Sequence, residues 1–103
     1  MVWVSFDGGP TRVAWHLWHD EALWLVCGGL EQDLPGAAGA HVATVTLGGA
    51  PWEVAVGPVV PGSPEWDVVV PLLHEKRRNA PDGEAQPQRW ATESSVLKLT
   101  PTR

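Results

Sequence analysis

The segment from Trp15 to Trp24 reads WHLWHDEALW and places three tryptophans and two histidines within ten residues. His16 and His19 could share one metal ion only if this segment were a helix, because residues three apart then lie on the same face. On a strand the two side chains point to opposite sides, and metal bonds of about 2.1 Å cannot reach both. The alternation of residues up to Leu17 favours a strand, so we expect no metal site at His16 and His19. His41 and His74 are expected to be ordinary hydrogen-bonded polar residues.

Common catalytic motifs are missing from the sequence. A serine nucleophile needs a neighbouring base, and none of the serines lies in a G-x-S-x-G setting that would expose it. The sequence also contains no G-x-G-x-x-G and no phosphate loop with Gly-Lys-Ser. These absences give no support for a hydrolase or for the usual nucleotide-binding loops, and we name no catalytic residue. The serines considered are Ser5, Ser63, Ser94 and Ser95.

Basic residues gather in one part of the chain. Four of the seven lie between Lys76 and Arg89. Cations at the C-terminal end of a helix complement its dipole, which is one explanation. The alternative is an anion site, in which Arg77, Arg78 and Arg89 converge on a phosphate or carboxylate while Trp90 offers a stacking face.

Tryptophan is unusually abundant, with seven Trp and no Tyr in 103 residues. Each buried indole removes about 150 to 250 Å² from water, and seven are more than one small core normally holds. We therefore expect some of the indoles to cover a cofactor, a ligand or a second subunit.

Composition limits the class of protein. The length predicts one domain over residues 1–103. Seven basic against twelve acidic residues give a net charge of -5, which argues against binding to nucleic acid or to an anionic membrane. No apolar run is long enough for a transmembrane helix and the first residues lack the pattern of a signal peptide, so we expect a complete, cytoplasmic chain. The single cysteine, Cys27, is expected to be a small buried apolar residue.

Alternating apolar residues and clusters of turn residues predict a mainly β fold. The expected turns are a tight hairpin at Asp7-Gly8-Gly9-Pro10, a four-residue type I bend at residues 19–22 and a turn at residues 48–51. Gly57-Pro58 should create a bulge or an edge. The six predicted strands cover residues 2–6, 11–19, 22–27, 41–47, 52–60 and 95–101.

Two of these strands make specific predictions about the core. In residues 11–19 the face with Val13, Trp15 and Leu17 is expected to point into it. The strand at residues 22–27 is apolar on both faces and should be central and covered twice. A helix over residues 11–27 remains an alternative, because this segment has no Gly or Pro and spaces several apolar residues at helical intervals.

One helix is predicted after the fifth strand. Ser63 is a good N-cap and Pro64 suits the first helical position. Trp66, Val70 and Leu73 form an apolar stripe, with Val69 and the stem of Arg77 alongside, and Pro71 on the opposite face should kink the helix. Residues 28–40 are expected to be a loop with room for one helical turn, and residues 80–90 a polar linker. The order of elements predicts a small barrel with a helix across an opening.

The sequence resembles the pyridoxamine 5'-phosphate oxidase-like family of FMN-binding split β-barrels. The resemblance spans most of the chain and includes the tail at residues 76–90. It is carried by a G-x-P-x-V pattern, a D-G-x-L-W hairpin and a V-x-V-T-V strand. The matching residues are Gly9, Pro10, Val13, Asp20, Leu23, Trp24, Val42, Thr44 and Val45.

The resemblance implies a six-stranded antiparallel split β-barrel that forms a homodimer. It further implies FMN or a deazaflavin in the groove between the subunits and an oxidoreductase that transfers hydride to or from the flavin. In this interpretation Trp15, Trp18 and Trp90 line the groove. The anion is held by arginines of one subunit or the other, namely Arg12, Arg77, Arg78 and Arg89.

One segment departs from the family pattern. Where the family commonly has S-x-K to bind the flavin phosphate, this chain has Leu30-Glu31-Gln32-Asp33, and two carboxylates would repel a phosphate. Either the anion is held elsewhere or the chain has lost the flavin. The alternative function is therefore a non-catalytic homodimer that binds a different small ligand or none, and a third is a purely structural interaction module.

Overall fold

The computed structural model describes residues 2–29, 31–76 and 85–102. The two helices are α1 (Pro64–Lys76) and α2 (Gln86–Glu93). The strands are β1 (Val2–Phe6), β2 (Arg12–Ala14), β3 (Leu17–His19), β4 (Ala22–Cys27), β5 (Val42–Thr46), β6 (Trp52–Pro58) and β7 (Ser95–Pro101).

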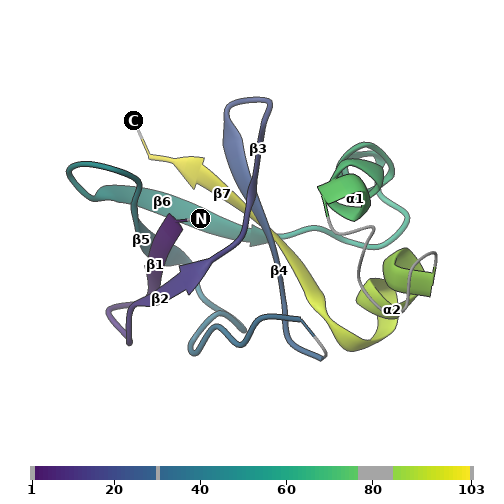
Figure 1. Cartoon of the computed structure of the whole chain (residues 1–103), viewed down its shortest axis with the longest axis horizontal. Helices are drawn as coiled ribbons and strands as arrows, with labels where there is room; N and C mark the ends of the chain where they lie inside the picture. Colours follow the sequence, from purple (N-terminus) through teal and green to yellow (C-terminus); the bar gives the residue numbers. More distant parts are fainter. Residues whose placement is uncertain (1, 30, 77–84, 103) are drawn as a thin grey trace.

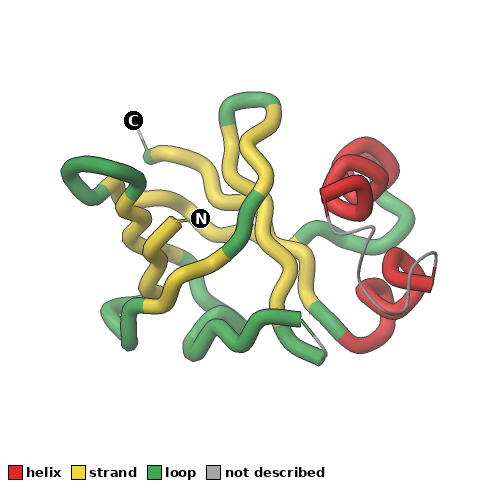
Figure 2. Tube along the Cα trace, viewed as in Figure 1, coloured by secondary structure: helices red, strands yellow, loops and turns green. Residues whose placement is uncertain are grey.

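The strands form one antiparallel sheet of seven strands in the order β2-β1-β5-β6-β7-β4-β3. The sheet curls into a half-barrel, and both helices pack on one side of it (Figure 1). Loops connect the strands at both ends, as Figure 2 shows in green. The prediction of a mainly β, barrel-like fold is confirmed.

The strand count differs from the prediction because the strand expected at residues 11–19 is broken at Trp15 and His16. Its first part, β2, pairs with β1 at one edge of the sheet, and its second part, β3, pairs with β4 at the other edge. The chain therefore passes directly from one edge to the other. This break gives seven strands instead of six, and the alternative of a helix over residues 11–27 is wrong.

The side chain of Gln32 fills the break. The β3–β4 register pairs Leu17 with Trp24, so a continuous ladder would go on to pair His16 with Leu25 and Trp15 with Val26. Instead, Gln32 Oε1 accepts a hydrogen bond from the Trp15 backbone N–H, and Gln32 Nε2 donates to the Trp15 carbonyl, both at 3.0 Å. Nε2 also donates to the Val26 carbonyl at 3.0 Å. The amide thus bonds the backbone on both sides of the gap.

The break also changes which residues of this segment face the core. Ala14 is buried inside the half-barrel, whereas Val13 pairs with Trp3 on the outer face and is exposed. The predicted core face of Val13, Trp15 and Leu17 is therefore wrong for Val13. Trp15 and Leu17, beyond the break, pack against the helix side of the sheet.

The two predicted hairpin turns are present, and the second is tighter than expected. Asp7 and Gly8 have positive φ values between β1 and β2. Asp20 and Glu21 also have positive φ, 53° and 60°. Positive φ at both central residues is typical of a two-residue type I′ turn. The four-residue type I bend predicted at residues 19–22 is therefore wrong.

The sheet separates two apolar clusters, and β4 contributes to both, as predicted for a strand covered twice. Leu23, Leu25 and Cys27 point into the half-barrel together with side chains of β1, β5, β6 and β7. Ala22, Trp24 and Val26 point to the other side, where they meet the helices. Because both faces are apolar, β4 has no residue in Ala22–Cys27 that faces water.

The first helix begins at the predicted position and buries part of the predicted apolar stripe. Ser63 Oγ accepts a hydrogen bond from the Trp66 N–H at 3.2 Å and caps the helix. Val69, Val70 and Leu73 are buried, while Pro71 lies within the helix on its exposed side.

The second helix, α2, was not predicted, and part of the expected linker forms it. Its N-cap residue, Ala85, makes no side-chain capping bond, and Pro87 lies in its first turn. Trp90 is completely buried against the sheet. The burial of this indole, rather than helix propensity, fixes the helix in place.

The remaining strand predictions hold. β5 stops pairing with β6 at Ala55, so Gly57 and Pro58 lie at a free edge on that side, as expected. Loop 31–40 contains turns and no helix in its described residues. Within residues 2–29, 31–76 and 85–102 neither helix is long and apolar enough to cross a membrane.

Replacing Gln32 by Ala should lower the free energy of unfolding by about 2 kcal/mol, because the Trp15 N–H and carbonyl would lose their partners. Urea denaturation measures this change. Gln88→Ala is the matched control, since Gln88 is exposed on α2, and it should change stability by less than about 0.5 kcal/mol. Equal effects of the two substitutions would contradict the role of Gln32.

Candidate functional site

The structure brings together three of the residues predicted to form a groove, and it places them in the layer between the sheet and the helices. The rings of Trp15 and Trp90 lie 6.4 Å apart, tilted by 38°. Trp90 has 0% of its surface exposed. Arg89 is its neighbour on α2. In a single subunit these indoles are thus packing contacts rather than walls of an open groove.

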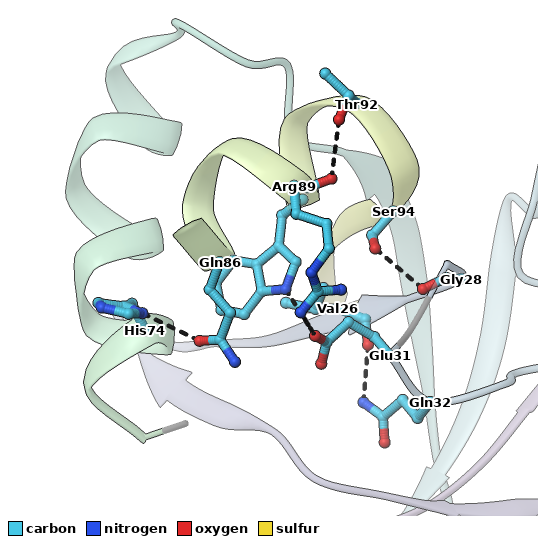
Figure 3. Close-up of polar contacts among 10 residues, drawn as sticks. Val26, Gly28, Glu31, Gln32, His74, Gln86, Arg89, Thr92 and Ser94 are labelled. Atoms are coloured by element: carbon cyan, nitrogen blue, oxygen red, sulfur yellow. Dashed lines mark hydrogen bonds and ion pairs between the residues drawn. The ribbon is translucent and has the colours of Figure 1, made fainter. Parts of the chain in front are cut away.

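Glu31 determines the electrostatics of this layer (Figure 3). Its Oε2 lies 2.8 Å from Arg89 Nη2 and accepts a hydrogen bond from Trp90 Nε1 at 2.9 Å. Only 4% of the Glu31 side chain is exposed. The residue that departs from the family pattern therefore neutralises Arg89 within the chain.

A glycine pair allows the chain to reach this position after β4. Gly28 and Gly29 both have positive φ, and a Cβ on Gly29 would lie 2.8 Å from the Glu93 carbonyl oxygen. Ser94 Oγ donates a hydrogen bond to the Gly28 carbonyl at 3.0 Å (Figure 3). The turn after β4 is thereby attached to the end of α2, which places Glu31 beside Arg89.

The other predicted anion-binding arginines are not part of this cluster in the described structure. Arg12 is exposed on the edge strand β2, and its Nη1 donates to the neighbouring Thr11 carbonyl at 3.4 Å. Arg77 and Arg78 lie outside the described residues. Among the described residues, Arg89 alone accompanies Trp90.

His16, His74 and Cys27 lie partly or fully buried. Burial lowers the pKa of His16, and His74 Nδ1 lies 3.0 Å from Gln86 Oε1 (Figure 3). Burial, with a smaller effect of Asp33, raises the pKa of Cys27 to about 11. In the part of the chain that the structure describes, no three His, Cys, Asp or Glu side chains gather as metal ligands.

An open cavity lies at the other end of the sheet, and we call it the mouth cleft. It has a volume of about 750 Å³. β4 and β7 pair as far as Leu23 and Leu99 and then separate, and the β3–β4 hairpin points away from the end of β7 (Figure 1). The residues that matter for its chemistry are Trp18, Asp20, Glu21, Trp52, Glu53 and Lys98.

Two half-exposed indoles form the apolar part of the mouth cleft. Trp18 pairs with Leu23, and Trp52 pairs with Val45. Because paired residues share a face of the sheet, both indoles extend the inner surface of the half-barrel to its rim. There they remain 51% and 48% exposed. They form a hydrophobic lining that the chain itself does not cover.

The polar part of the cleft is acidic. Asp20 and Glu21 come from the β3–β4 turn and Glu53 from β6. Lys98, the one lysine in the lining, has its Nζ 2.7 Å from Glu65 Oε2 and 5.3 Å from the centre of the Trp24 ring. Among the described residues no cation forms an ion pair with the three cleft carboxylates.

Sequence reasoning identified only Trp18 of this cleft. In β6, Trp52, Val54 and Val56 alternate along the strand, and their shared face points inward. An indole at the end of an inward face, directly beside a turn, is a signal that could have identified both Trp18 and Trp52.

Replacing Glu31 by Ala should lower the free energy of unfolding by about 3 kcal/mol, since it leaves the Arg89 charge buried without its carboxylate. Glu31→Gln keeps an acceptor for Trp90 Nε1 and should cost about half as much. Thermal and urea denaturation measure both. The control is Glu93→Gln, which changes an exposed carboxylate on α2, the helix that carries Arg89. Unchanged stability of Glu31→Ala would show that the pair is not structural.

Comparison with known proteins gives no relative for this chain. No protein-family model, curated protein or solved structure matches it. The resemblance to flavin-binding split barrels therefore stays a prediction.

Proposed function

We propose that this chain is a binding domain for a small, flat organic molecule, and that the ligand lies in the mouth cleft against Trp18 and Trp52. The observation that carries the proposal is the half-exposure of both indoles, 51% and 48%, on the lining of one cavity. A volume of about 750 Å³ is suited to a ligand of ordinary metabolite size.

The position of the two indoles supports binding rather than a structural role. Indoles that stabilise this fold are packed, as Trp24 and Trp90 are. Trp18 and Trp52 lie at the rim instead, where a flat ring could stack on them and remove their surface from water. Backbone pairing in β3 and β6 holds both residues in place before any ligand arrives, which lowers the entropic cost of binding.

The second candidate function is a flavin-dependent oxidoreductase. In this proposal the half-barrel is a variant of the split β-barrel. An isoalloxazine ring is flat and could stack on the same indoles. The carboxylates of Asp20 and Glu21 would oppose the phosphate of FMN, so riboflavin or a deazaflavin without phosphate suits the cleft better.

We also propose that two copies associate as a homodimer. A chain with a net charge of -5 repels its own copies, so an interface needs an uncharged surface. The outer face of β1, β2 and β5 provides one, because its exposed residues are aromatic, aliphatic or hydroxylic, and the carboxylate of Glu53, which pairs with Thr44, borders it on β6. These residues are Trp3, Val13, Val42 and Thr44, with half-buried Ser5 and Thr46 between them.

Replacing Trp18 or Trp52 by Ala should weaken the binding of riboflavin roughly fivefold, which corresponds to about 1 kcal/mol of lost stacking. Titrations followed through the indole N–H resonances of the protein measure this. Trp3→Ala is the control, because Trp3 lies outside the cleft. Binding unaffected by either rim substitution would place the ligand elsewhere, and absence of riboflavin binding at high micromolar concentration would remove the flavin candidate.

Replacing Trp3 by Glu should convert the homodimer into a monomer, because the substitution puts a charge into the centre of the uncharged face. Sedimentation velocity of both proteins measures the mass. Leu47→Glu, at an equally exposed residue in the turn after β5, should leave the dimer intact. A wild-type protein that sediments as a monomer at about 100 µM would contradict the proposed association.

A further inference from the structure

We infer that the mouth cleft selects organic cations, that is, flat or compact apolar molecules with a protonated amine or a quaternary ammonium group. This inference rests on the proposed function and adds the charge of the ligand to it. It also separates this cleft from a flavin-phosphate site, which requires the opposite charge.

The carboxylates of the cleft come from two elements that the fold brings to one cavity. Asp20 and Glu21 lie at the tip of the β3–β4 hairpin, and Glu53 lies near the start of β6. More than thirty positions separate Glu21 and Glu53 in the chain. Glu53 pairs with Thr44 and therefore leaves β6 on the face opposite to Trp52. The negative potential beside the two indoles comes from Asp20 and Glu21.

The lysine of the cleft does not cancel this charge. Lys98 Nζ is held 2.7 Å from Glu65 Oε2, at the first turn of α1. The same ammonium lies 5.3 Å from the Trp24 ring centre, so its position is fixed from two sides. The Lys98–Glu65 pair is neutral as a unit, and the three carboxylates therefore remain uncompensated within the described residues.

Indole rings and carboxylates attract the same kind of ligand. The face of an indole carries negative electrostatic potential and binds ammonium groups that lie over it. Carboxylates nearby add a direct attraction between opposite charges, which falls as salt is added. A neutral flat molecule gains only the stacking, and an anion of the same shape is repelled. The cleft should thus rank ligands as cation, neutral molecule, anion.

The β3–β4 turn offers a variant that removes charge without harming the fold. Asp20 and Glu21 occupy positions of positive φ, where Asn followed by Gly is the preferred pair. The double substitution Asp20→Asn with Glu21→Gly should therefore raise the melting temperature while it removes two of the cleft carboxylates. A loss of affinity in this variant cannot come from unfolding.

The test uses three bicyclic probes of similar size and different charge: N-methylquinolinium, quinoline and 1-naphthoate. Affinities are measured from the shifts of the Trp18 and Trp52 indole N–H resonances, with Trp3 as the internal reference outside the cleft. We expect N-methylquinolinium to bind about tenfold more tightly than quinoline and 1-naphthoate to bind most weakly. The preference should shrink between about 0.05 M and about 1 M NaCl.

The turn variant supplies the second part of the test. Asp20→Asn with Glu21→Gly should weaken N-methylquinolinium about fivefold and leave quinoline unchanged. The matched control is Asp7→Asn in the β1–β2 turn, which also has positive φ and lies outside the cleft; it should change no affinity.

The outcomes separate the two proposals. If none of the probes shifts Trp18 or Trp52, the proposed function fails and cation selection fails with it. If quinoline binds as tightly as N-methylquinolinium, or if the turn variant keeps full affinity for the cation, ligand binding stands and cation selection is overturned.

Discussion

The side-chain amide of Gln32 is the contact on which the shape of this domain depends. It occupies the position where the β3–β4 ladder would continue to Trp15 and Val26, and it bonds the backbone on both sides. The segment at residues 12–19 pairs with β1 at one edge of the sheet and with β4 at the other. Its backbone must stop pairing with β1 before it begins to pair with β4. The amide satisfies the backbone groups exposed by that transfer, which would otherwise carry the cost of unmet hydrogen bonds. The backbone groups of Trp15 and Val26 are therefore hydrogen-bonded where the strand crosses between the two edges.

Glu31, the residue before Gln32, connects the same loop to helix α2. Glu31 pairs with Arg89 and with Trp90, so the segment of Glu31 and Gln32 holds both the break between β2 and β3 and the position of α2. Glu31 therefore has a structural role in this chain. A carboxylate that would repel a phosphate instead holds an arginine of its own chain, and that arginine is then committed to the fold.

Features that depend on neighbouring residues were predictable from the sequence, and those that depend on distant ones were not. The alternation in β1 and the Ser63 cap of α1 act over a few residues, and both agree with the structure. The break at Trp15 depends on a glutamine seventeen positions away, and α2 depends on the burial of Trp90 against the sheet. The mouth cleft needs residues from β3, β6 and β7 together. No local pattern contains these relations.

The abundance of tryptophan follows from two separate demands on the chain. Trp24 and Trp90 fill the layer between sheet and helices, which a domain of this size must pack densely. Trp3, Trp18 and Trp52 are about half exposed. Two of these three lie in the acidic cleft, where an indole attracts the same ligands as the carboxylates around it. Under the proposed function, the exposure of Trp18 and Trp52 and the charge of the neighbouring β3–β4 turn serve the same ligand.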